Sequence, residues 1–551
     1  MRADFRAAPH GTAEPSNRLL IALVAAAAVL LFLGLDASTI WDANEAYYTE
    51  TPRHMVESGD YVNPEFNGAP RFNKPVLSYW IVAASYHLFG VSVWAERVAI
   101  AFGTLGIAGA AFVIARVMWS ARAGWIAALV LLSAPRVVFF SRRIFIDIWI
   151  TLFMSLVLMF FALAEARPAH RRRYLLLMYA AAGLGVLTKG PIAIALPALA
   201  FLVYLAIEGR LREIRRMHLM TGTLIVLAIV VPWYAMVYAE HGPQYLVEFF
   251  VGENVGRYAD TYGQQARPAY FYIPVLLTEL FPWSLFVPAA LWAGWKMKTP
   301  LARLLLAWIA VIVLVFTFSS TKQDLYIFPI VAALAALIAG LFERAAAALE
   351  PDRTVAHRTW PFVALLMVLF FAAMWRMFGS AASPYYIRGA FSAGAILLVG
   401  ACGVLWFWRA RRTHETVMAL GLAFVAVNYV LVLIGLPDFE RFKPVAPLAA
   451  AALGRSAEGP VIQYRVALPS MSWYLGRPIE EVLDEPVLQN RLSREGETLV
   501  LTEAANYQVV EDLSPRPTCI VDGRPLFDVK LRSVLDGTAM PEMLLISNRC
   551  E

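Results

Sequence analysis

Stretches of about 20 apolar residues recur through this chain as far as residue 435. Each stretch is long enough to cross a bilayer as a single α-helix. Hydrophobic residues make up 60% of the 551 residues and charged residues only 16%, whereas about 25% of residues are charged in a soluble domain. The pattern therefore predicts an integral membrane protein. The net charge of +6 is small and lies mainly in loops, so it indicates membrane topology and no nucleic-acid binding.

We expect an all-α polytopic membrane fold with about 13 transmembrane helices. The first, Leu19–Leu35, follows a polar segment with three arginines, which predicts a cytoplasmic N-terminus. No small-residue cleavage pattern follows it, so we interpret it as a membrane helix rather than a signal peptide. The other expected spans are 93–118, 121–141, 145–165, 172–188, 190–207, 219–238, 272–295, 301–318, 325–343, 359–378, 388–409 and 415–435.

Basic residues cluster in alternate loops, and placing all these clusters in the cytoplasm gives a consistent topology. The clusters are Arg167 with Arg171–Arg173, Arg210–Arg216, Lys296–Arg303, Arg344–Arg358 and Arg409–Arg412. This topology places two large loops outside, 36–92 and 239–271. The apolar run Val76–Gly90 is too short for a span and would break the alternation. We therefore expect a helix that lies on the outer membrane surface.

The composition changes after residue 435, where short β-rich runs alternate with turn residues. We expect residues 455–551 to form a small α/β domain on the outer side, after a membrane domain that covers residues 1–454. Cys519 and Cys550 lie in this small domain and could form a disulfide bond if the domain is exported. The third cysteine, Cys402, falls in an apolar run.

The loop at residues 41–80 combines carboxylates, cations and aromatic side chains. A loop that only connects two membrane helices needs none of these groups. Functional residues concentrate on loops that a rigid scaffold holds, so this loop predicts a site for a charged amphiphile or a sugar. An ordered loop with ordinary surface charges is the alternative interpretation.

Several cations lie on the outer side near helix ends, against the usual bias of lysine and arginine toward cytoplasmic loops. They are Lys74, Arg142, Arg143, Lys189, Arg257, Arg267 and Lys322. Each one alone could extend to lipid headgroups, but together they predict a phosphate site. The four that we expect to converge on one external cavity are Lys74, Arg143, Arg257 and Lys322.

The acidic candidates for catalysis or binding are Asp42, Glu45, Asp147 and Glu253. Asp147 lies one helical turn beyond Arg143, so it could neutralise this arginine or act directly on a substrate. A carboxylate beside a phosphate can act as the general base that takes a proton from an incoming hydroxyl. The chain has no His-rich or Cys-rich spacing, so we expect no essential metal, and a divalent cation is the less favoured alternative.

The motifs resemble those of the bacterial GT-C glycosyltransferases, relatives of the protein O-mannosyltransferases and of the lipid A aminoarabinose transferases. The first loop carries N-E-A-Y-Y-x-E-x-P-R-x-M and then F-N-K-P-x-L-x-Y-W, which is the most specific part of the resemblance. The later motifs, in the family's order, are R-x-x-x-D at Arg143–Asp147, L-T-K-G at Leu187–Gly190, P-W-Y at Pro232–Tyr234, F-P-W at Phe281–Trp283, S-S-T-K-x-x-x-Y-x-x-P at Ser319–Pro329 and Y-L-G-R-P at Tyr474–Pro478. The resemblance covers nearly the whole chain.

The resemblance implies a bacterial inner-membrane enzyme whose site and C-terminal domain face the periplasm. Such enzymes take a sugar from a polyprenyl phosphate, in bacteria undecaprenyl phosphate. They transfer it with inversion to a lipid such as lipid A, a glycan or a protein, usually without an essential metal. In this chain the resemblance implies that Asp42 or Glu45 is the base and that Lys74 binds the donor phosphate or orients the acid. The residues expected to line the substrate are Tyr48, Tyr326 and Glu253.

The chain departs from the family pattern at two positions. Asn44 stands before Glu45 where the family usually has an aspartate, and we favour Asp42 over Glu45 as the replacement base. Asn73 stands before Lys74 where aminoarabinose transferases often have a glutamate. Both departures weaken the case for aminoarabinose as the sugar.

Two other functions remain as alternatives. One is a protein O-mannosyltransferase that uses polyprenyl-phosphate mannose. The other, a lipid transporter or flippase, would need polar groups along a path between the two membrane faces. The unusual charges of this chain collect at one face, which favours an enzyme.

Overall fold

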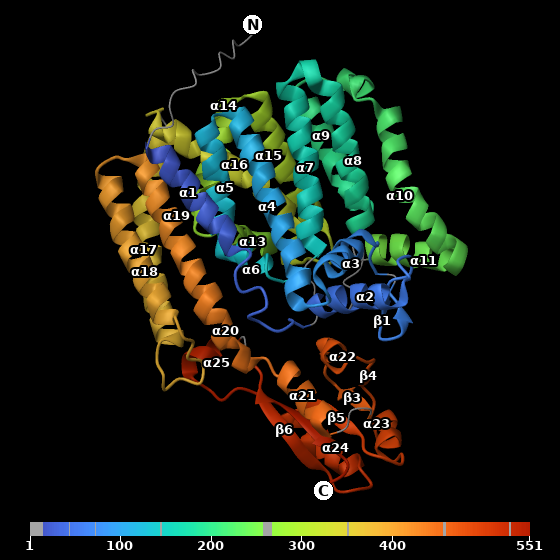
Figure 1. The fold of residues 1–551 in the computed structure, drawn as a ribbon. Helices are drawn as coiled ribbons and strands as arrows, with labels where there is room; N and C mark the ends of the chain where they lie inside the picture. Colours follow the sequence, from blue (N-terminus) through green and yellow to red (C-terminus); the bar gives the residue numbers. More distant parts are fainter. Residues whose placement is uncertain are drawn as a thin grey trace.

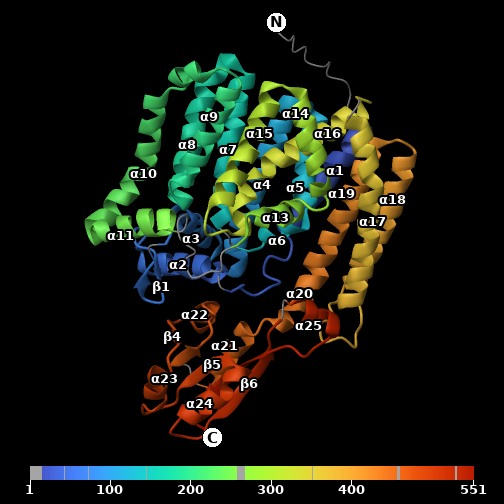
Figure 2. The ribbon, with the colours of Figure 1, turned by 180° about the vertical axis from the view of Figure 1, so that it is seen from behind.

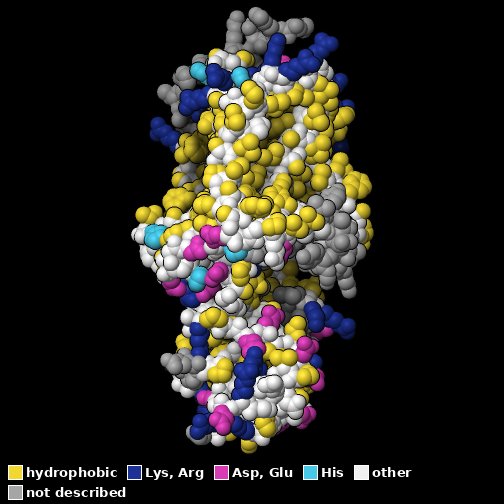
Figure 3. Space-filling model, turned by 90° about the vertical axis from the view of Figure 1, so that its right-hand side faces the viewer, with side chains coloured by type: hydrophobic (Ala, Val, Ile, Leu, Met, Phe, Trp, Pro, Cys, Tyr) yellow, Lys and Arg dark blue, Asp and Glu magenta, His cyan; other side chains and the backbone are white. Residues whose placement is uncertain are grey.

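Long apolar helices lie side by side in a bundle, and a smaller α/β domain lies at one end of it (Figure 1). The computed structural model describes residues 15–42, 44–71, 73–143, 146–256, 267–349, 352–455, 459–527 and 530–550. Hydrophobic side chains cover the outside of the bundle in a broad band, as expected for a surface that contacts lipid (Figure 3). The predicted fold class, a helical membrane domain with a small α/β domain, is confirmed.

Within the described residues, 8 helices are long and apolar enough to cross a membrane. These spans are α4 (Val93–Met118), α7 (Ile146–Ala166), α10 (Leu219–His241), α15 (Pro300–Phe318), η6 with α16 (Asp324–Ile330 and Val331–Ala346), α17 (Asp352–Phe378), α18 (Ala390–Arg409) and α19 with its continuation (Thr413–Phe442). A ninth would be the pair Ala269–Glu279 and Trp283–Met297, bent by 117°. This pair contains α13 (Tyr272–Glu279) and α14 (Val287–Met297).

The remaining expected spans also form helices, which are shorter or more polar. They are α1 (Pro15–Leu30), α5 (Ala121–Ser133) with α6 (Pro135–Phe140), α8 (Arg171–Lys189) and α9 (Ile192–Ile207). Every stretch predicted to span the membrane therefore contains a helix in its described part, while length and composition qualify 8 or 9 of them as spans.

Helix α4 illustrates how local sequence sets these elements. Ser92 precedes it, and its hydroxyl oxygen accepts a hydrogen bond from the Ala95 N–H, which satisfies a donor that the first helical turn leaves free. The helix ends at Trp119, whose ring packs against Gly340 of α16. A Cβ atom at Gly340 would lie 2.2 Å from this ring, so only glycine permits the close approach of the two segments.

Short elements cover the end of the bundle that faces the α/β domain (Figure 1). They are α2 (Asn44–Ser58), the hairpin β1–β2 (Glu65–Phe66 and Ala69–Pro70), α3 (Leu77–Phe89), α11 (Pro243–Val247) and the π-helix η3 (Glu248–Gly256). Helix α3 has 13 residues and is about 20 Å long, too short to cross a hydrocarbon layer of about 30 Å. The first loop contacts the end of α10, where the Trp233 indole N–H donates to the Val62 carbonyl at 3.0 Å.

The C-terminal domain contains a five-stranded sheet in the order β4-β3-β5-β7-β6. Its strands are β3 (Val461–Tyr464), β4 (Glu480–Val482), β5 (Leu499–Glu503), β6 (Cys519–Pro525) and β7 (Glu542–Ser547). Strand β3 runs parallel to β4 and β5, and β7 pairs antiparallel with both β5 and β6. The helices of this domain are α22 (Ser470–Leu475), α23 (Glu485–Leu492), α24 (Tyr507–Leu513) and α25 (Leu531–Asp536).

Helix α21 (Val445–Arg455) precedes the boundary predicted at residue 454, and yet it packs into the core of the C-terminal domain. Its Leu448 and Ala452 are buried in one cluster with Leu499 and Leu545 of the sheet. The compact α/β unit therefore includes residues that the sequence analysis assigned to the membrane domain. The difference arises because the boundary was placed at the first β-rich run, whereas the apolar helix before this run covers the sheet.

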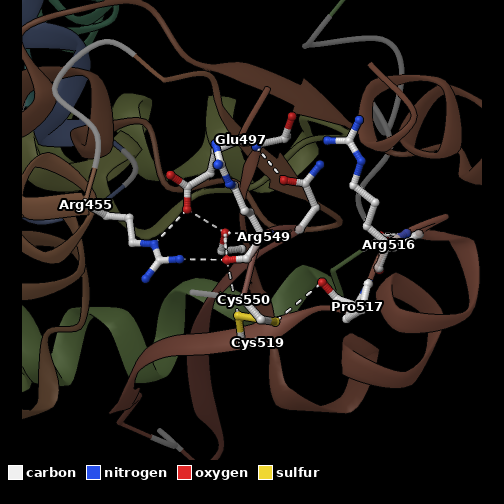
Figure 4. Close-up of a disulfide and its surroundings, with 11 residues drawn as sticks. Arg455, Glu497, Arg516, Pro517, Cys519, Arg549 and Cys550 are labelled. Carbon is white, nitrogen blue, oxygen red and sulfur yellow. Dashed lines mark hydrogen bonds and ion pairs between the residues drawn. A yellow bond between two sulfur atoms is a disulfide. The ribbon is translucent and has the colours of Figure 1, made fainter. Parts of the chain in front are cut away.

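A disulfide bond joins Cys519 of β6 to Cys550, just beyond β7 (Figure 4). The two Cα atoms are 5.6 Å apart. Next to the bridge, the Arg455 guanidinium donates to Glu497 at 2.7 Å and to the Arg549 carbonyl at 2.6 Å. The pairing that the sequence left open is present in this structure.

Candidate functional site

A cavity of about 230 Å³ lies where the first loop meets the membrane helices. Its walls come from α2 and the segment after β2, from α7, from the junction of α8 with α9, and from α15 and η6. The lining residues are Asn44, Tyr48, Arg71, Asn73, Lys74, Ile146, Asp147, Ile150, Met154, Lys189, Ile192, Leu196, Phe249, Phe316, Ser319, Gln323, Leu325, Tyr326 and Pro329.

Asp147 and Lys189 form an ion pair in the wall of the cavity. Asp147 lies in the first turn of α7 and Lys189 is the last residue of α8, so each charge lies at the helix end whose dipole favours it. Helix α8 ends there because Gly190 has a φ of 91°, a conformation that glycine adopts without strain. The Lys189 ammonium also lies 5.2 Å from the centre of the Tyr326 ring.

Two further cations come from the first loop. The Lys74 ammonium donates to the Asn73 carbonyl at 2.8 Å. The Arg71 guanidinium lies 3.8 Å from the centre of the Tyr47 ring and donates to the Tyr79 hydroxyl at 3.3 Å. These contacts orient the two side chains, which line the cavity together with the ion pair of the helices.

The remainder of the lining is largely apolar. Ile146, Ile150 and Met154 follow one face of α7 in steps of four residues, and Ile192 and Leu196 do the same on α9. The cavity therefore changes from a charged end at the surface of the bundle to an apolar trough between helices. Such a lining suits a molecule with an anionic head and a hydrocarbon tail.

Asp42, the favoured base in the sequence analysis, is not among the residues that line the cavity. Its carboxylate accepts hydrogen bonds from Ser470 of the C-terminal domain, at 2.7 Å from the backbone N–H and at 2.5 Å from the hydroxyl. Burial raises the pKa of Asp42 to about 6, and the two bonds from Ser470 only partly offset this effect. The proposed role of Asp42 as a base stays a prediction, and the structure places its side chain elsewhere.

Glu45 is fully buried against Arg97 of α4. The Arg97 guanidinium donates to both of its carboxylate oxygens, at 2.8 and 3.1 Å, and the Trp41 N–H donates at 2.6 Å. Burial alone would raise the pKa of Glu45, but Arg97 and this N–H more than compensate, so its pKa lies below the usual value. Glu45 thus anchors the loop to α4 and does not line the cavity.

The other predicted residues divide between the cavity and its surroundings. Lys74, Asp147, Tyr48 and Tyr326 line it. Arg143 and Lys322 are not in the lining. The Arg143 guanidinium lies 4.6 Å from the centre of the Trp41 ring. The Lys322 ammonium donates at 2.6 Å to the carbonyl of Ser319, and Ser319 lines the cavity. The remaining two predictions, Arg257 and the Glu253 side chain, lie outside the part of the chain that the structure describes.

Sequence reasoning did not select Arg71, and it named Lys189 only as one of seven outer cations. It missed Arg97 entirely, although an arginine inside an apolar span is a signal for a buried partner. No local pattern could have identified Ser470, because 428 residues separate it from Asp42. Among the described residues, no group of three or more His, Cys, Asp or Glu side chains is placed to hold a metal ion.

Comparison with known proteins points to one enzyme family. Residues 73–235 match the family described as dolichyl-phosphate-mannose-protein mannosyltransferase. An undecaprenyl phosphate-α-4-amino-4-deoxy-L-arabinose arabinosyl transferase of Pectobacterium carotovorum is 32% identical over 353 residues, 63% of this chain and 62% of that protein. The chain spans less than two thirds of the length of this and the next most similar relatives. The transferase of the same name from Edwardsiella ictaluri is 30% identical over 415 residues, 71% of this chain and 73% of that protein.

The fold agrees with a solved structure, that of ArnT from Cupriavidus metallidurans bound to undecaprenyl phosphate. It superposes with a TM-score of 0.81 at 23% identity and covers 97% of this chain and 98% of that one. At 23% identity this structure shows a similar fold only. The Edwardsiella relative is also similar in sequence, over more than two thirds of both chains. The chain therefore belongs to the GT-C glycosyltransferase family that includes the undecaprenyl phosphate-aminoarabinose arabinosyl transferases.

Proposed function

We propose that this enzyme transfers a sugar from an undecaprenyl phosphate donor to lipid A. The observation that carries the proposal is the lining of the cavity, with Arg71, Lys74 and Lys189 at one end and an apolar trough at the other. A prenyl phosphate has the same division into an anionic head and a hydrocarbon tail. The names of the related arabinosyl transferases include such a donor, undecaprenyl phosphate-α-4-amino-4-deoxy-L-arabinose.

The cavity is proposed to open toward the periplasm. The basic segments follow α7, α9, α14, α16 and α18, and these connections alternate with less basic ones along the chain. Lys and Arg side chains gather at the end of the bundle away from the C-terminal domain (Figure 3). The disulfide Cys519–Cys550 fits an oxidising compartment on the other side. This orientation supports the earlier placement of residues 36–92 and of the C-terminal domain outside the cytoplasm.

The chemistry follows from the charges around the cavity. An acceptor hydroxyl or phosphate attacks the anomeric carbon of the donor sugar, the bond from this carbon to the phosphate oxygen breaks, and the product has inverted configuration. Lys74 and Arg71 stabilise the departing prenyl phosphate. Asp147 is the carboxylate best placed to accept the proton when the nucleophile is a hydroxyl, because Asp42 and Glu45 are engaged with Ser470 and Arg97.

No metal enters this scheme, because the cations of the protein face the phosphate themselves. We expect activity to survive treatment with EDTA. A requirement for an added divalent cation would contradict this part of the proposal.

The test is a transfer assay with the purified protein in lipid nanodiscs. Undecaprenyl phosphate-linked 4-amino-4-deoxy-L-arabinose and lipid A are supplied, and mass spectrometry follows the gain of one aminopentose on lipid A. Parallel reactions replace the donor with a polyprenyl-phosphate hexose, or lipid A with a hydroxyl-rich peptide. Transfer to the peptide alone would favour a protein O-mannosyltransferase, and transfer of no sugar from any polyprenyl phosphate would refute the proposal.

A further inference from the structure

Helix α22 of the C-terminal domain contacts the first loop at several points. Its first residue, Ser470, donates two hydrogen bonds to the Asp42 carboxylate. Further along this helix, the Tyr474 hydroxyl accepts a hydrogen bond from the Ile40 N–H at 2.8 Å, and the Trp473 carbonyl accepts one from Arg53 at 3.2 Å. Ser470 is completely buried at this contact.

These contacts hold the loop at two points that flank cavity residues. Asp42 lies just before α2, and Arg53 lies near the end of α2, where its guanidinium also lies 5.1 Å from the centre of the Trp473 ring. Between the two points, α2 presents Asn44 and Tyr48 to the cavity. The position of these two side chains therefore depends on a domain that contributes no side chain to the cavity lining.

The geometry of Asp42 fits this structural task better than proton transfer. Each of its carboxylate oxygens accepts a hydrogen bond from Ser470, and neither oxygen belongs to the cavity lining. The nearby charges are those of Lys443 and Glu45, and both already have other partners. The Lys443 ammonium pairs with Glu440 at 3.3 Å and donates to the Thr39 carbonyl.

We propose that Asp42 is a positioning residue, which with Ser470 fastens the C-terminal domain to the start of α2 and so holds Asn44 and Tyr48 in the cavity wall. The catalytic consequence rests on the proposed function, because its readout is sugar transfer. The docking itself does not, and it can be measured without substrate.

Three variants separate positioning from catalysis. Asp42→Leu removes both acceptors, and Ser470→Ala removes one of the two donors. Asp42→Asn keeps two hydrogen bonds with Ser470, because its amide can accept from the N–H and donate to the hydroxyl. The control is Glu485→Gln, which breaks an ion pair with Arg465 inside the same domain (3.0 Å) and leaves the contact with the loop untouched.

Docking is measured by hydrogen–deuterium exchange of peptides from α2 and α22 in nanodiscs, and transfer by kcat and KM. We expect Asp42→Leu and Ser470→Ala to speed exchange in both helices. Asp42→Leu should lower kcat/KM by about tenfold or more, the scale of a misplaced binding group. Asp42→Asn should stay within about threefold of the wild type, because its hydrogen bonds are retained.

Two results would overturn the proposal. One is an equal loss of kcat/KM in Asp42→Asn and Asp42→Leu, which would identify Asp42 as the base. The other is an exchange pattern in Ser470→Ala that matches both the wild type and Glu485→Gln. If exchange changes as expected while the wild type transfers no sugar from any donor, the docking is supported and the proposed function fails, so the two failures can be told apart.

Discussion

The cavity has two walls that differ in how they are held. The inner wall comes from α7, α9 and α15, each of which packs residues into the core of the bundle. The outer wall comes from the first loop, which is anchored by Arg97 on the membrane side and by α22 on the other. The inner wall is thus shaped by packing, whereas the outer wall depends on a few buried polar contacts.

This difference separates two aspartates that look equivalent in sequence. Asp147 belongs to the inner wall, faces the cavity and is paired with a cation that also faces it. Asp42 belongs to the first loop, and its carboxylate is hydrogen-bonded to Ser470 of the C-terminal domain. A carboxylate in a motif near the site can therefore have a structural role or a catalytic one. Its hydrogen-bond and ion-pair partners in the structure distinguish the two.

The largest effect is expected where the outer wall meets the membrane helices. Arg97→Leu leaves Glu45 buried without its cation and also removes the hydrogen bonds to the Leu35 and Ser38 carbonyls. Breaking a buried ion pair in this way should cost about 3–5 kcal/mol of stability. Chemical unfolding in detergent measures the loss, with Arg303→Leu, which breaks a pair with Glu208 at 2.7 Å, as the control. Equal stability of Arg97→Leu and the wild type would show that this anchor is dispensable.

On the inner wall, Asp147→Asn should lower kcat by about a hundredfold or more if the acceptor is a hydroxyl, because an amide cannot accept the proton. The fold should survive, since the amide oxygen can still accept a hydrogen bond from Lys189. Single-turnover transfer measures the effect, and Glu208→Gln, in the pair with Arg303, is the matched control. A drop in donor affinity with unchanged kcat would instead assign Asp147 to binding.

Lys74 tests the anionic end of the cavity. Lys74→Ala should raise the KM for the prenyl phosphate donor about tenfold, the scale of one lost charge-assisted contact to phosphate. Lys74→Arg should recover part of the loss, because it restores the charge with a different shape. Lys296→Ala changes a lysine of α14 outside the cavity and serves as the control. An unchanged KM in Lys74→Ala would remove this residue from the phosphate site.

The smallest effect concerns the docked domain and pH. The pKa of Asp42 is about 6 when docked and 3.8 in a free chain, so the charged form disfavours docking. Its contribution to docking is complete below pH 3.8 and is lost as the pH rises through 6. Lys443, whose burial lowers its pKa to about 8, stays charged across this range.

Exchange of α22 should therefore be faster at pH 7 than at pH 4.5, after correction for the intrinsic rate. Asp42→Asn cannot ionise, so it should remove this pH dependence. A pH dependence that persists in the variant would have to come from another group.

The sequence predicted most of the fold because hydrophobic length is a local property. Every expected span contains at least one helix, and the run from Val76 proved to contain the 13-residue helix α3. The domain boundary at residue 454 separated α21 from the sheet that its apolar face covers. The number of segments that truly cross the bilayer depends on packing and tilt, which a hydropathy pattern does not contain.

The site was predictable only in part. Lys74 and Asp147 could be selected because each is a charge at a helix end or loop on the outer side. The partners of Asp42 and Glu45 could not, because Ser470 and Arg97 come from distant parts of the chain. The apolar trough formed by Ile150, Met154 and Leu196 was also invisible, since these residues look like any other membrane-spanning positions.

The strand order of the C-terminal domain has a consequence for how the enzyme matures. Strand β7 follows β6 in sequence but lies between β5 and β6, so the sheet cannot close until Ser547 has left the ribosome. By that time the membrane helices have already been inserted. Of the two anchors of the outer wall, the one from α22 can therefore be completed only at the last stage of biogenesis, whereas Arg97 of α4 is available earlier.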